Sequence, residues 1–189
     1  MIRQGEGAWQ LTKGERKEHN ADTVEAGNAL SELCVTRGVM KSLRIYVDTS
    51  VIGGCLDDEF RDASRKLMDL FQTGQAFLMA SELLLQELDE APAEVQGVLP
   101  SLPLDCIERV YLNPEAERLK ELYLTAEVVG VAHANDALHV ALAVVARADM
   151  IVSWNFRHIV HFDKMRGFNA VNLREGYGRL DILSPMEVV

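Results

Sequence analysis

The sequence lacks the features of several protein classes. It has only three cysteines, far apart and without a C-x-x-C pair, which excludes a disulfide framework and a cysteine zinc site and is typical of a reduced, intracellular chain. The first twenty residues contain no apolar run of the signal-peptide type. The longest apolar stretch, ALHVALAVVARADMIVSW, is interrupted by His139, Arg147 and Asp149, so no membrane span is predicted. We therefore expect a cytoplasmic protein.

The sequence also lacks an excess of positive charge. Its formal net charge is −10, which argues against a general electrostatic attraction to nucleic acid. A local attraction is still compatible with the sequence, because basic residues gather between positions 151 and 178. This segment contains only two acidic residues, against the basic Arg157, Lys164, Arg166 and Arg174 and the histidines His158 and His161.

Two regions differ in composition. Residues 1–39 are predicted to form a flexible or partly helical N-terminal extension, because the first twenty are polar and aperiodic and only Thr23–Arg37 has a weak helical pattern. Residues 40–189 are predicted to form one domain. So short an extension cannot bury a core of its own, and deleting residues 1–39 should leave a folded domain.

From Leu43 onward, strand and helix patterns alternate. Strands are predicted at Leu43–Val47, Ala76–Ala80, Ile107–Leu112, Met150–Trp154 and Ala170–Leu173. Helices are predicted at about 58–73, 82–89, 93–99, 115–128 and 135–146, with Asn113-Pro114 as a clear helix start. This alternation predicts an α/β fold with a parallel sheet covered on both faces, in which ligands bind beyond the carboxyl ends of the strands.

The stretch LRIYVDTSVIGG, residues 43–54, ends a predicted strand in a carboxylate. Asp48 could serve as the N-cap of the next helix, since Asp, Thr and Ser are all favoured there. The alternative is that Asp48 binds a cation, because a carboxylate near a domain core is costly unless something pairs with it. The motif does not have the glycine and lysine spacing of a phosphate loop.

Three further polar residues could join Asp48. Glu87 lies in a predicted helix after the second strand, Asp136 begins the strongest helix, and Asn155 follows the fourth strand. Each has an ordinary explanation: a solvated helix-face glutamate, a first-turn acid that pairs with the helix dipole, and a loop residue. Glu82 is a rival to Glu87, although it is better suited to its helix N-terminus. Together, Asp48, Glu87, Asp136 and Asn155 predict clustered oxygen donors at one sheet edge, a set that suits Mg²⁺ or Mn²⁺.

The motifs IYVDTSVIGG, ASELLLQEL, NDALHVALAVVARADMIVSWNFRHI and GYGRLDILSPMEVV resemble those of PIN domain ribonucleases, especially the VapC-like toxins. The resemblance covers residues 40–189. It implies a three-layer α/β/α sandwich with a short, mostly parallel central sheet, and a metal-dependent endoribonuclease often neutralised by a cognate antitoxin. On the family pattern Asp48, Glu87 and Asp136 are the first three acidic positions, and Ser50 is a supporting hydroxyl.

The sequence departs from the commonest family pattern at the fourth acidic position, where Asn155 replaces an aspartate. An amide oxygen can still bind magnesium or a ligating water, but it lacks the charge. The replacement therefore predicts weaker metal binding and puts a second metal ion in doubt more than the first. A structural role for the Asn155 amide, in which its NH₂ donates to a backbone carbonyl, is the alternative.

The remaining candidates are basic or imidazole side chains. Arg157 and His158 follow Asn155 and are either solvated loop residues or phosphate contacts that position RNA. His139 lies one helical turn from Asp136 and is best explained as a half-buried core residue. A transition-metal site made by His133, Asp136 and His139 is a minor alternative.

We expect the chain to hydrolyse RNA with Asp48, Glu87, Asp136 and Asn155 as catalytic residues, the first three as Mg²⁺ or Mn²⁺ ligands. Ser50, Arg157 and His158 are the expected substrate-binding residues. The expected partners are RNA, a cognate antitoxin protein and a second copy of the chain, with no membrane. Two other classes remain open: a catalytically weakened PIN-like module that binds RNA or protein, and an α/β protein that binds a small phosphorylated ligand.

Overall fold

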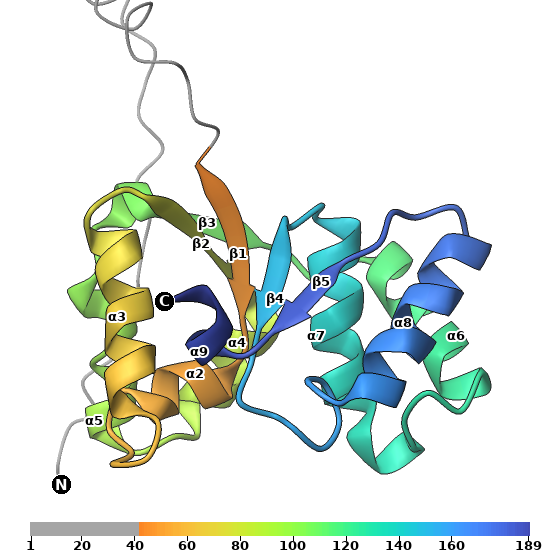
Figure 1. Ribbon diagram of the computed structural model, residues 1–189, viewed down its shortest axis with the longest axis horizontal. Coiled ribbons are helices and arrows are strands. Elements are labelled where there is room, and N and C mark those ends of the chain that lie inside the picture. The colour runs from red at the N-terminus through yellow and green to blue at the C-terminus, as the bar shows by residue number, and fades with distance from the viewer. Residues whose placement is uncertain (1–41) are drawn as a thin grey trace, which may run out of the picture. The chain divides into compact units, whose positions relative to one another are not determined.

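The structure is a computed structural model that describes residues 42–189. These residues form one five-stranded sheet in which every strand pair is parallel, in the order β3-β2-β1-β4-β5 (Figure 1). The strands are β1 (Leu43–Val47), β2 (Ala76–Ser81), β3 (Ile107–Val110), β4 (Met150–Val152) and β5 (Asp181–Leu183). The predicted α/β sandwich with a short parallel sheet is confirmed.

Helices cover both faces of the sheet. One face carries α6 (Pro114–Thr125), α7 (Ala134–Val145) and α8 (Phe162–Arg174). The other carries α2 (Thr49–Gly54), α3 (Arg61–Gln72) and the short C-terminal α9 (Pro185–Val188). The chain also forms α4 (Glu82–Asp89), α5 (Ala93–Gln96) and three single 3₁₀ turns, η1 (Leu99–Ser101), η2 (Leu104–Cys106) and η3 (Val131–His133).

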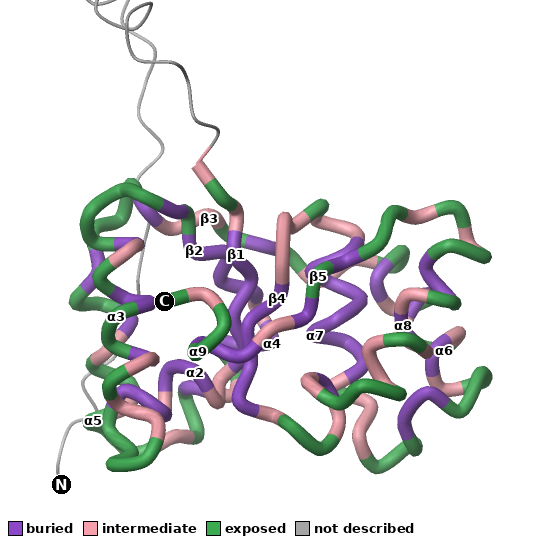
Figure 2. The backbone as a smooth tube through the Cα atoms, in the orientation of Figure 1, coloured by how far each residue is buried: buried purple, intermediate pink, exposed green. Residues whose placement is uncertain are grey.

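Two apolar clusters, one on each face, hold the layers together. Successive strand residues point to opposite faces, so Tyr46 packs with α6, α7 and α8, whereas its neighbours Ile45 and Val47 pack with α2 and α3. The central strand β1 is buried over most of its length, as the purple segments of Figure 2 show. Burial on both faces explains why the central strands β1 and β2 are mostly apolar, whereas the edge strand β3 contains Glu108 and Arg109.

The predicted fifth strand at Ala170–Leu173 is wrong. These residues lie in α8, where Phe168, Val171 and Asn172 form its buried stripe at helical spacing. The short apolar run A-V-N-L fits a strand as well as a helix, and its partners outside the run decide between them. The actual fifth strand, β5, has one fully buried residue, Ile182, which gives little periodic signal.

Other predicted boundaries agree with the structure within a few residues. The predicted third and fourth strands extend past the ends of β3 and β4. The Asn113 side chain accepts a hydrogen bond from the Ala116 N–H, as expected at the start of α6. The predicted N-terminal extension lies outside the described residues. Within residues 42–189 no helix combines the length and apolar character needed to cross a bilayer.

Candidate active site

The polar residues singled out in the sequence meet where the strand order reverses direction. From β1 the chain continues to β2 on one side of the sheet, and β4 later adds to the other side. Asp48 follows β1, Asn155 follows β4, Glu87 lies on α4 directly after β2, and Asp136 lies in the first turn of α7. Such a switch point at the carboxyl ends of parallel strands is where open α/β sheets bind ligands.

The Asp48 carboxylate does not cap α2, although Asp48 occupies the N-cap position. It is buried and accepts one hydroxyl hydrogen bond on each oxygen, from Ser50 Oγ at 2.5 Å and from Ser153 Oγ at 2.7 Å. Burial raises the pKa of Asp48, an effect opposed by His139 and by the two hydroxyls. The capping explanation therefore fails, and the carboxylate is held in a position that is costly when it is charged.

Two backbone N–H groups fix the hydroxyls that surround Asp48. The Trp154 N–H donates to Ser50 Oγ at 2.9 Å, and the Asn155 N–H donates to Ser153 Oγ at 2.9 Å. Each hydroxyl oxygen thus accepts a hydrogen bond from the segment after β4 and donates one to Asp48. Ser50 was predicted to bind substrate. Its hydroxyl donates a hydrogen bond to Asp48 and so positions the carboxylate.

Glu87 is bound by three side chains from two other elements. Its Oε2 accepts hydrogen bonds from Thr49 Oγ1 and, at 3.1 Å, from His139 Nε2, while Oε1 accepts from Asn135 Nδ2 at 3.3 Å. Burial raises the pKa of Glu87, but His139, Thr49 and Asn135 outweigh it and the net pKa is lowered. Glu87 is therefore an ionised carboxylate at neutral pH. The rival Glu82 instead accepts the Leu112 backbone N–H at 2.9 Å.

Asp136 and Asn155 are hydrogen-bonded to each other. Asn155 Nδ2 donates to Asp136 Oδ1 at 2.9 Å, and Asn155 Oδ1 accepts the His158 backbone N–H at 3.0 Å. Because a backbone N–H can only donate, the amide oxygen must face His158 and the NH₂ must face Asp136. Burial raises the pKa of Asp136, opposed by His158 and His133. The structural alternative predicted for Asn155 is thus partly correct, although its NH₂ binds a carboxylate and not a backbone carbonyl.

Hydrogen bonds join three of the four predicted catalytic residues, and the fourth, Glu87, is bonded to residues that lie beside them in the chain. Asp48 connects through Ser153 to Asn155 and from there to Asp136, while Glu87 connects to Thr49, beside Asp48, and to His139, on the same helix as Asp136. The geometry brings the four together; their catalytic role stays a prediction. Carboxylate oxygens retain lone pairs beyond these bonds, so the donor types suit a hard divalent cation. In residues 42–189 the group that brings its ligand atoms within 4.8 Å of one another is His133, Asp136 and His158, so Asp48, Glu87 and Asp136 would have to draw closer, or use bridging waters, to share one ion.

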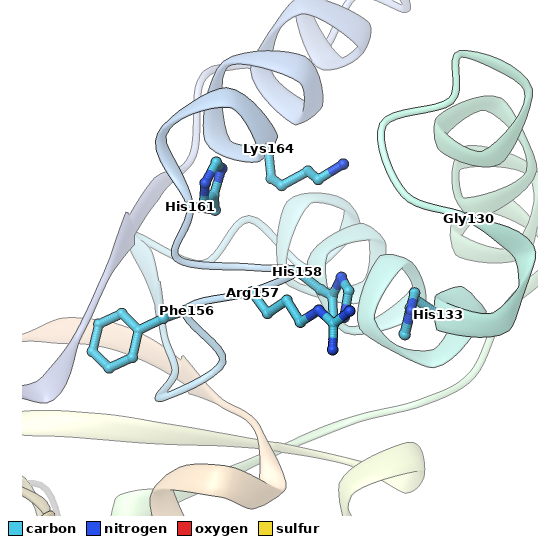
Figure 3. A pocket seen from close by; sticks show the side chains of 7 residues that line it. All are labelled: Gly130, His133, Phe156, Arg157, His158, His161 and Lys164. Carbon is cyan, nitrogen blue, oxygen red and sulfur yellow. The ribbon is translucent and has the colours of Figure 1, made fainter.

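A basic pocket adjoins Asp136. It has a volume of about 550 Å³ and is lined by Gly130, His133, Phe156, Arg157, His158, His161 and Lys164 (Figure 3). No carboxylate lines it, and it contains both predicted phosphate contacts, Arg157 and His158. The local positive charge inferred from the sequence therefore lies next to the carboxylates. Binding of RNA by these two residues stays a prediction.

His139 cannot take part in the predicted transition-metal group. It is buried, and its two ring nitrogens contact Tyr46 Oη at 2.8 Å and Glu87 Oε2 at 3.1 Å. The core assignment is correct, but it missed that His139 also orients Glu87. Sequence reasoning also missed Thr49, Asn135 and Ser153. Each is adjacent to, or two residues from, a predicted site residue, which was the only available signal.

Comparisons with protein families and with solved structures found matches to this chain. A family model described as "PIN domain" matches residues 44–157, which is more than half of the chain. A crystal structure of VapBC2 from Rickettsia felis bound to a DNA fragment from their promoter aligns at 15% sequence identity and a TM-score of 0.45, covering 64% of this chain and 95% of that chain. No curated protein matches the chain. On the family match, which spans Asp48 to Asn155, the chain belongs to the PIN domain family, whose members are generally nucleases.

Proposed function

We propose that the chain is a metal-dependent endoribonuclease that hydrolyses RNA phosphodiester bonds, and that it is the cytoplasmic toxin of a toxin–antitoxin pair. The observation that carries the nuclease proposal is that Asp48, Glu87 and Asp136, each held by its own hydrogen bonds, gather at the switch point of the sheet. The toxin role and the antitoxin partner rest on the resemblance of the sequence motifs.

Asp48, Glu87 and Asp136 are the residues that would bind Mg²⁺ or Mn²⁺. When bound, such an ion activates water and neutralises charge on the scissile phosphate. The chain's own groups have separate tasks: Ser50 and Ser153 orient Asp48, and His139 orients Glu87. Arg157, in the adjoining pocket, attracts the RNA backbone without reading its sequence.

The proposal is tested with the purified full chain and a pool of single-stranded RNAs. We expect cleavage with Mg²⁺ or Mn²⁺, none after chelation, and recovery when the ion is returned. Glu87→Gln is the matched control, because it keeps the side-chain shape and one acceptor oxygen while it removes the charge. Cleavage that persists in chelator, or in Glu87→Gln at the wild-type rate, would contradict the proposal.

A second candidate function is a PIN-like module that binds RNA or protein without cleaving it. It is favoured by one observation: the fourth acidic position holds Asn155, whose amide is already bonded to Asp136 and to the His158 N–H. RNA retention without cleavage under every metal condition would select this function.

Asn155→Asp separates the two roles of the amide. The new carboxylate would face Asp136 across the 2.9 Å contact that the NH₂ now makes, so like-charge repulsion should raise the pKa of the pair. Without metal we expect a loss of about 1 kcal/mol, or about 3 °C in Tm, near neutral pH. The loss should vanish at acidic pH, where the pair shares a proton.

Mg²⁺ should reverse the defect of Asn155→Asp, because a divalent cation outweighs the repulsion between the carboxylates. Calorimetric titration should then give tighter Mg²⁺ binding than in the wild type, with cleavage at least equal. Asn155→Ala is the control that removes both hydrogen bonds without adding charge. Unchanged or weaker Mg²⁺ binding by Asn155→Asp would rule out a ligand position for residue 155.

A further inference from the structure

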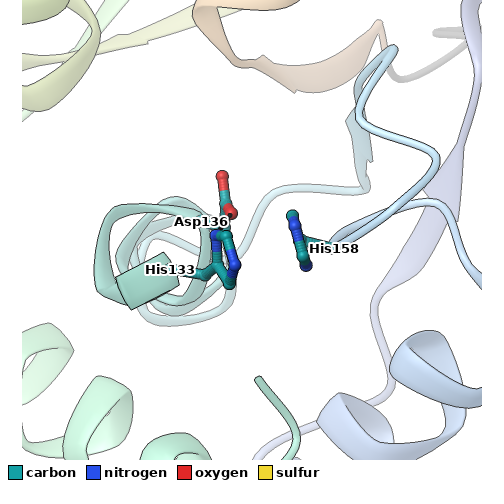
Figure 4. A group of neighbouring side chains, drawn as sticks. All are labelled: His133, Asp136 and His158. Atoms are coloured by element: carbon teal, nitrogen blue, oxygen red, sulfur yellow. Dashed lines mark ion pairs between the residues drawn. The ribbon is translucent and has the colours of Figure 1, made fainter. Parts of the chain in front are cut away.

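A group of potential metal ligands lies beside the carboxylate network and shares Asp136 with it. His133 ends η3, Asp136 lies in the first turn of α7, and His158 lies in the loop after β4 (Figure 4). One ligand atom from each lies within 4.8 Å of the others, and all three side chains are partly exposed. His133 Nδ1 and Asp136 Oδ2 are 3.5 Å apart.

The donor types differ from those of the magnesium ligands. Two imidazoles and one carboxylate, with room for water, form a set typical of Zn²⁺ and related transition metals, whereas Mg²⁺ prefers oxygen alone. Two atoms bound to one tetrahedral zinc ion lie roughly 3.4 Å apart, as the His133–Asp136 pair already does. Since the His158 ligand atom lies within 4.8 Å of the other two, it needs to move by no more than about 1.4 Å to reach the same separation.

The imidazoles must also turn to bind one ion. The rings of His133 and His158 stack with centroids 3.5 Å apart and planes 20° apart, so their in-plane nitrogen lone pairs run side by side. Neither side-chain ring is held by a hydrogen bond from the core: within the described residues, His133 has its contact to Asp136, and His158 is fixed through its backbone N–H to Asn155. Ring rotation at this partly exposed position is therefore open to both.

The basic neighbours set the expected strength of the site. Arg157 and Lys164 line the same pocket and oppose a cation, but Lys164 Nζ is bound to the Val128 carbonyl at 2.6 Å and Arg157 is exposed to solvent. The Asp136 carboxylate supplies one compensating negative charge. The balance predicts a site of moderate affinity, one that is filled and emptied as free metal changes.

We propose that His133, Asp136 and His158 bind a transition-metal ion such as Zn²⁺, and that this ion inhibits the nuclease by withdrawing Asp136 from the magnesium ligands. The inhibitory consequence rests on the proposed nuclease function; the metal site does not. Asp136 belongs to both sets, so occupation of one competes with occupation of the other.

Co²⁺ is the probe for the site, because its visible spectrum reports coordination geometry and ligand type. Titration of the full chain without Mg²⁺ should give one equivalent of tetrahedral or five-coordinate Co²⁺ that Zn²⁺ displaces. Added Mg²⁺ should lower the apparent Co²⁺ affinity, because both ions use Asp136. The spectrum should contain no sulfur-to-cobalt band, which excludes the cysteine thiols as ligands. His133→Ala and His158→Ala should each lower the affinity at least about 10-fold.

Asp48→Asn is the matched control for the binding experiment. It alters the carboxylate network but none of the three proposed ligands, so Co²⁺ affinity should be unchanged. Loss of Co²⁺ binding in Asp48→Asn with retention in His133→Ala would locate the ion among the carboxylates and overturn the proposal. Absence of saturable Co²⁺ binding by the wild type would overturn it as well.

Cleavage assays then test the inhibition. At fixed Mg²⁺, Zn²⁺ should inhibit the wild type, while His133→Ala, measured relative to its own zinc-free rate, should need at least about 10-fold more Zn²⁺ for the same fractional inhibition. Equal Zn²⁺ sensitivity of the two proteins would overturn the inhibitory role. If the wild type cleaves no RNA, the nuclease proposal fails, and the Co²⁺ titration still decides whether the site exists.

Discussion

Asp48→Asn is expected to abolish RNA cleavage while leaving the metal-free protein at least as stable as the wild type. The buried carboxylate is bonded to Ser50 and Ser153 and carries a charge that burial disfavours. Asparagine has nearly the same shape and can bond both hydroxyls, because its oxygen accepts from one and its NH₂ donates to the other. Loss of the anionic ligand should lower the cleavage rate at least about 100-fold.

The sign of the stability effect follows from the pKa. Because burial raises the folded-state pKa of Asp48, the stabilisation that the neutral acid provides is complete below the unfolded pKa of about 3.9 and is lost as pH rises through the folded value. The melting temperature of Asp48→Asn relative to the wild type should therefore increase from acidic to neutral pH.

Mg²⁺ should change which of the two proteins, wild type or Asp48→Asn, has the higher melting temperature. The ion offsets the cost of the buried charge in the wild type, so it should raise the wild-type melting temperature and leave that of Asp48→Asn nearly unchanged. Scanning calorimetry at acidic and neutral pH, with and without Mg²⁺, measures both effects. A metal-free Asp48→Asn variant that melts well below the wild type at neutral pH would mean that the carboxylate stabilises the fold.

Gly54→Ala should destabilise the domain by about 1–3 kcal/mol because the site is overpacked. A Cβ at Gly54 would lie 2.5 Å from Ser64 Oγ and 2.8 Å from Trp154 Nε1. These two atoms are already joined by a hydrogen bond of 2.8 Å from the Trp154 indole N–H, and both side chains are buried. The pair cannot separate without losing this bond, so relaxation offers little relief.

Gly53→Ala is the control next to it on α2. A Cβ there would meet nothing within 4 Å, and alanine favours a helix more than glycine does. The variant should match the wild type or gain up to about 1 kcal/mol in unfolding free energy. Urea denaturation of both variants checks the contrast; equal stabilities would show that the Trp154 region moves to accept the methyl group.

The central strands and the helix after Asn113 were predictable because their signals are local. β1 and β2 are short, mostly apolar segments, and an asparagine before a proline marks the start of α6. The helix around Ala170 was not predictable, because its buried face depends on distant partners. Phe168 packs edge-on against Tyr123, and Asn172 Oδ1 accepts a hydrogen bond from the Tyr123 hydroxyl. Nothing near Asn172 in the sequence marks a polar residue bound inside the core.

The candidate site could be predicted only as a set of acids at strand ends. The topology of a parallel sheet is enough to bring Asp48, Glu87 and Asp136 to one edge. It does not give the partners of these acids, which depend on side-chain directions at a scale of 1 Å. The two hydrogen bonds of the Asn155 amide, and the contact of His139 with Glu87, became visible only from coordinates.

The Asn155 amide couples the proposed binding of the metal ion to the proposed binding of RNA. One end of the amide binds Asp136, and the other binds the backbone of His158, in the segment that carries Arg157 into the basic pocket. A ligand that shifts Asp136 must therefore shift the energy of this segment, and a ligand that orders the segment must shift the energy of Asp136. Such coupling is reciprocal, so the factor by which RNA changes the affinity for Mg²⁺ must equal the factor by which Mg²⁺ changes the affinity for RNA.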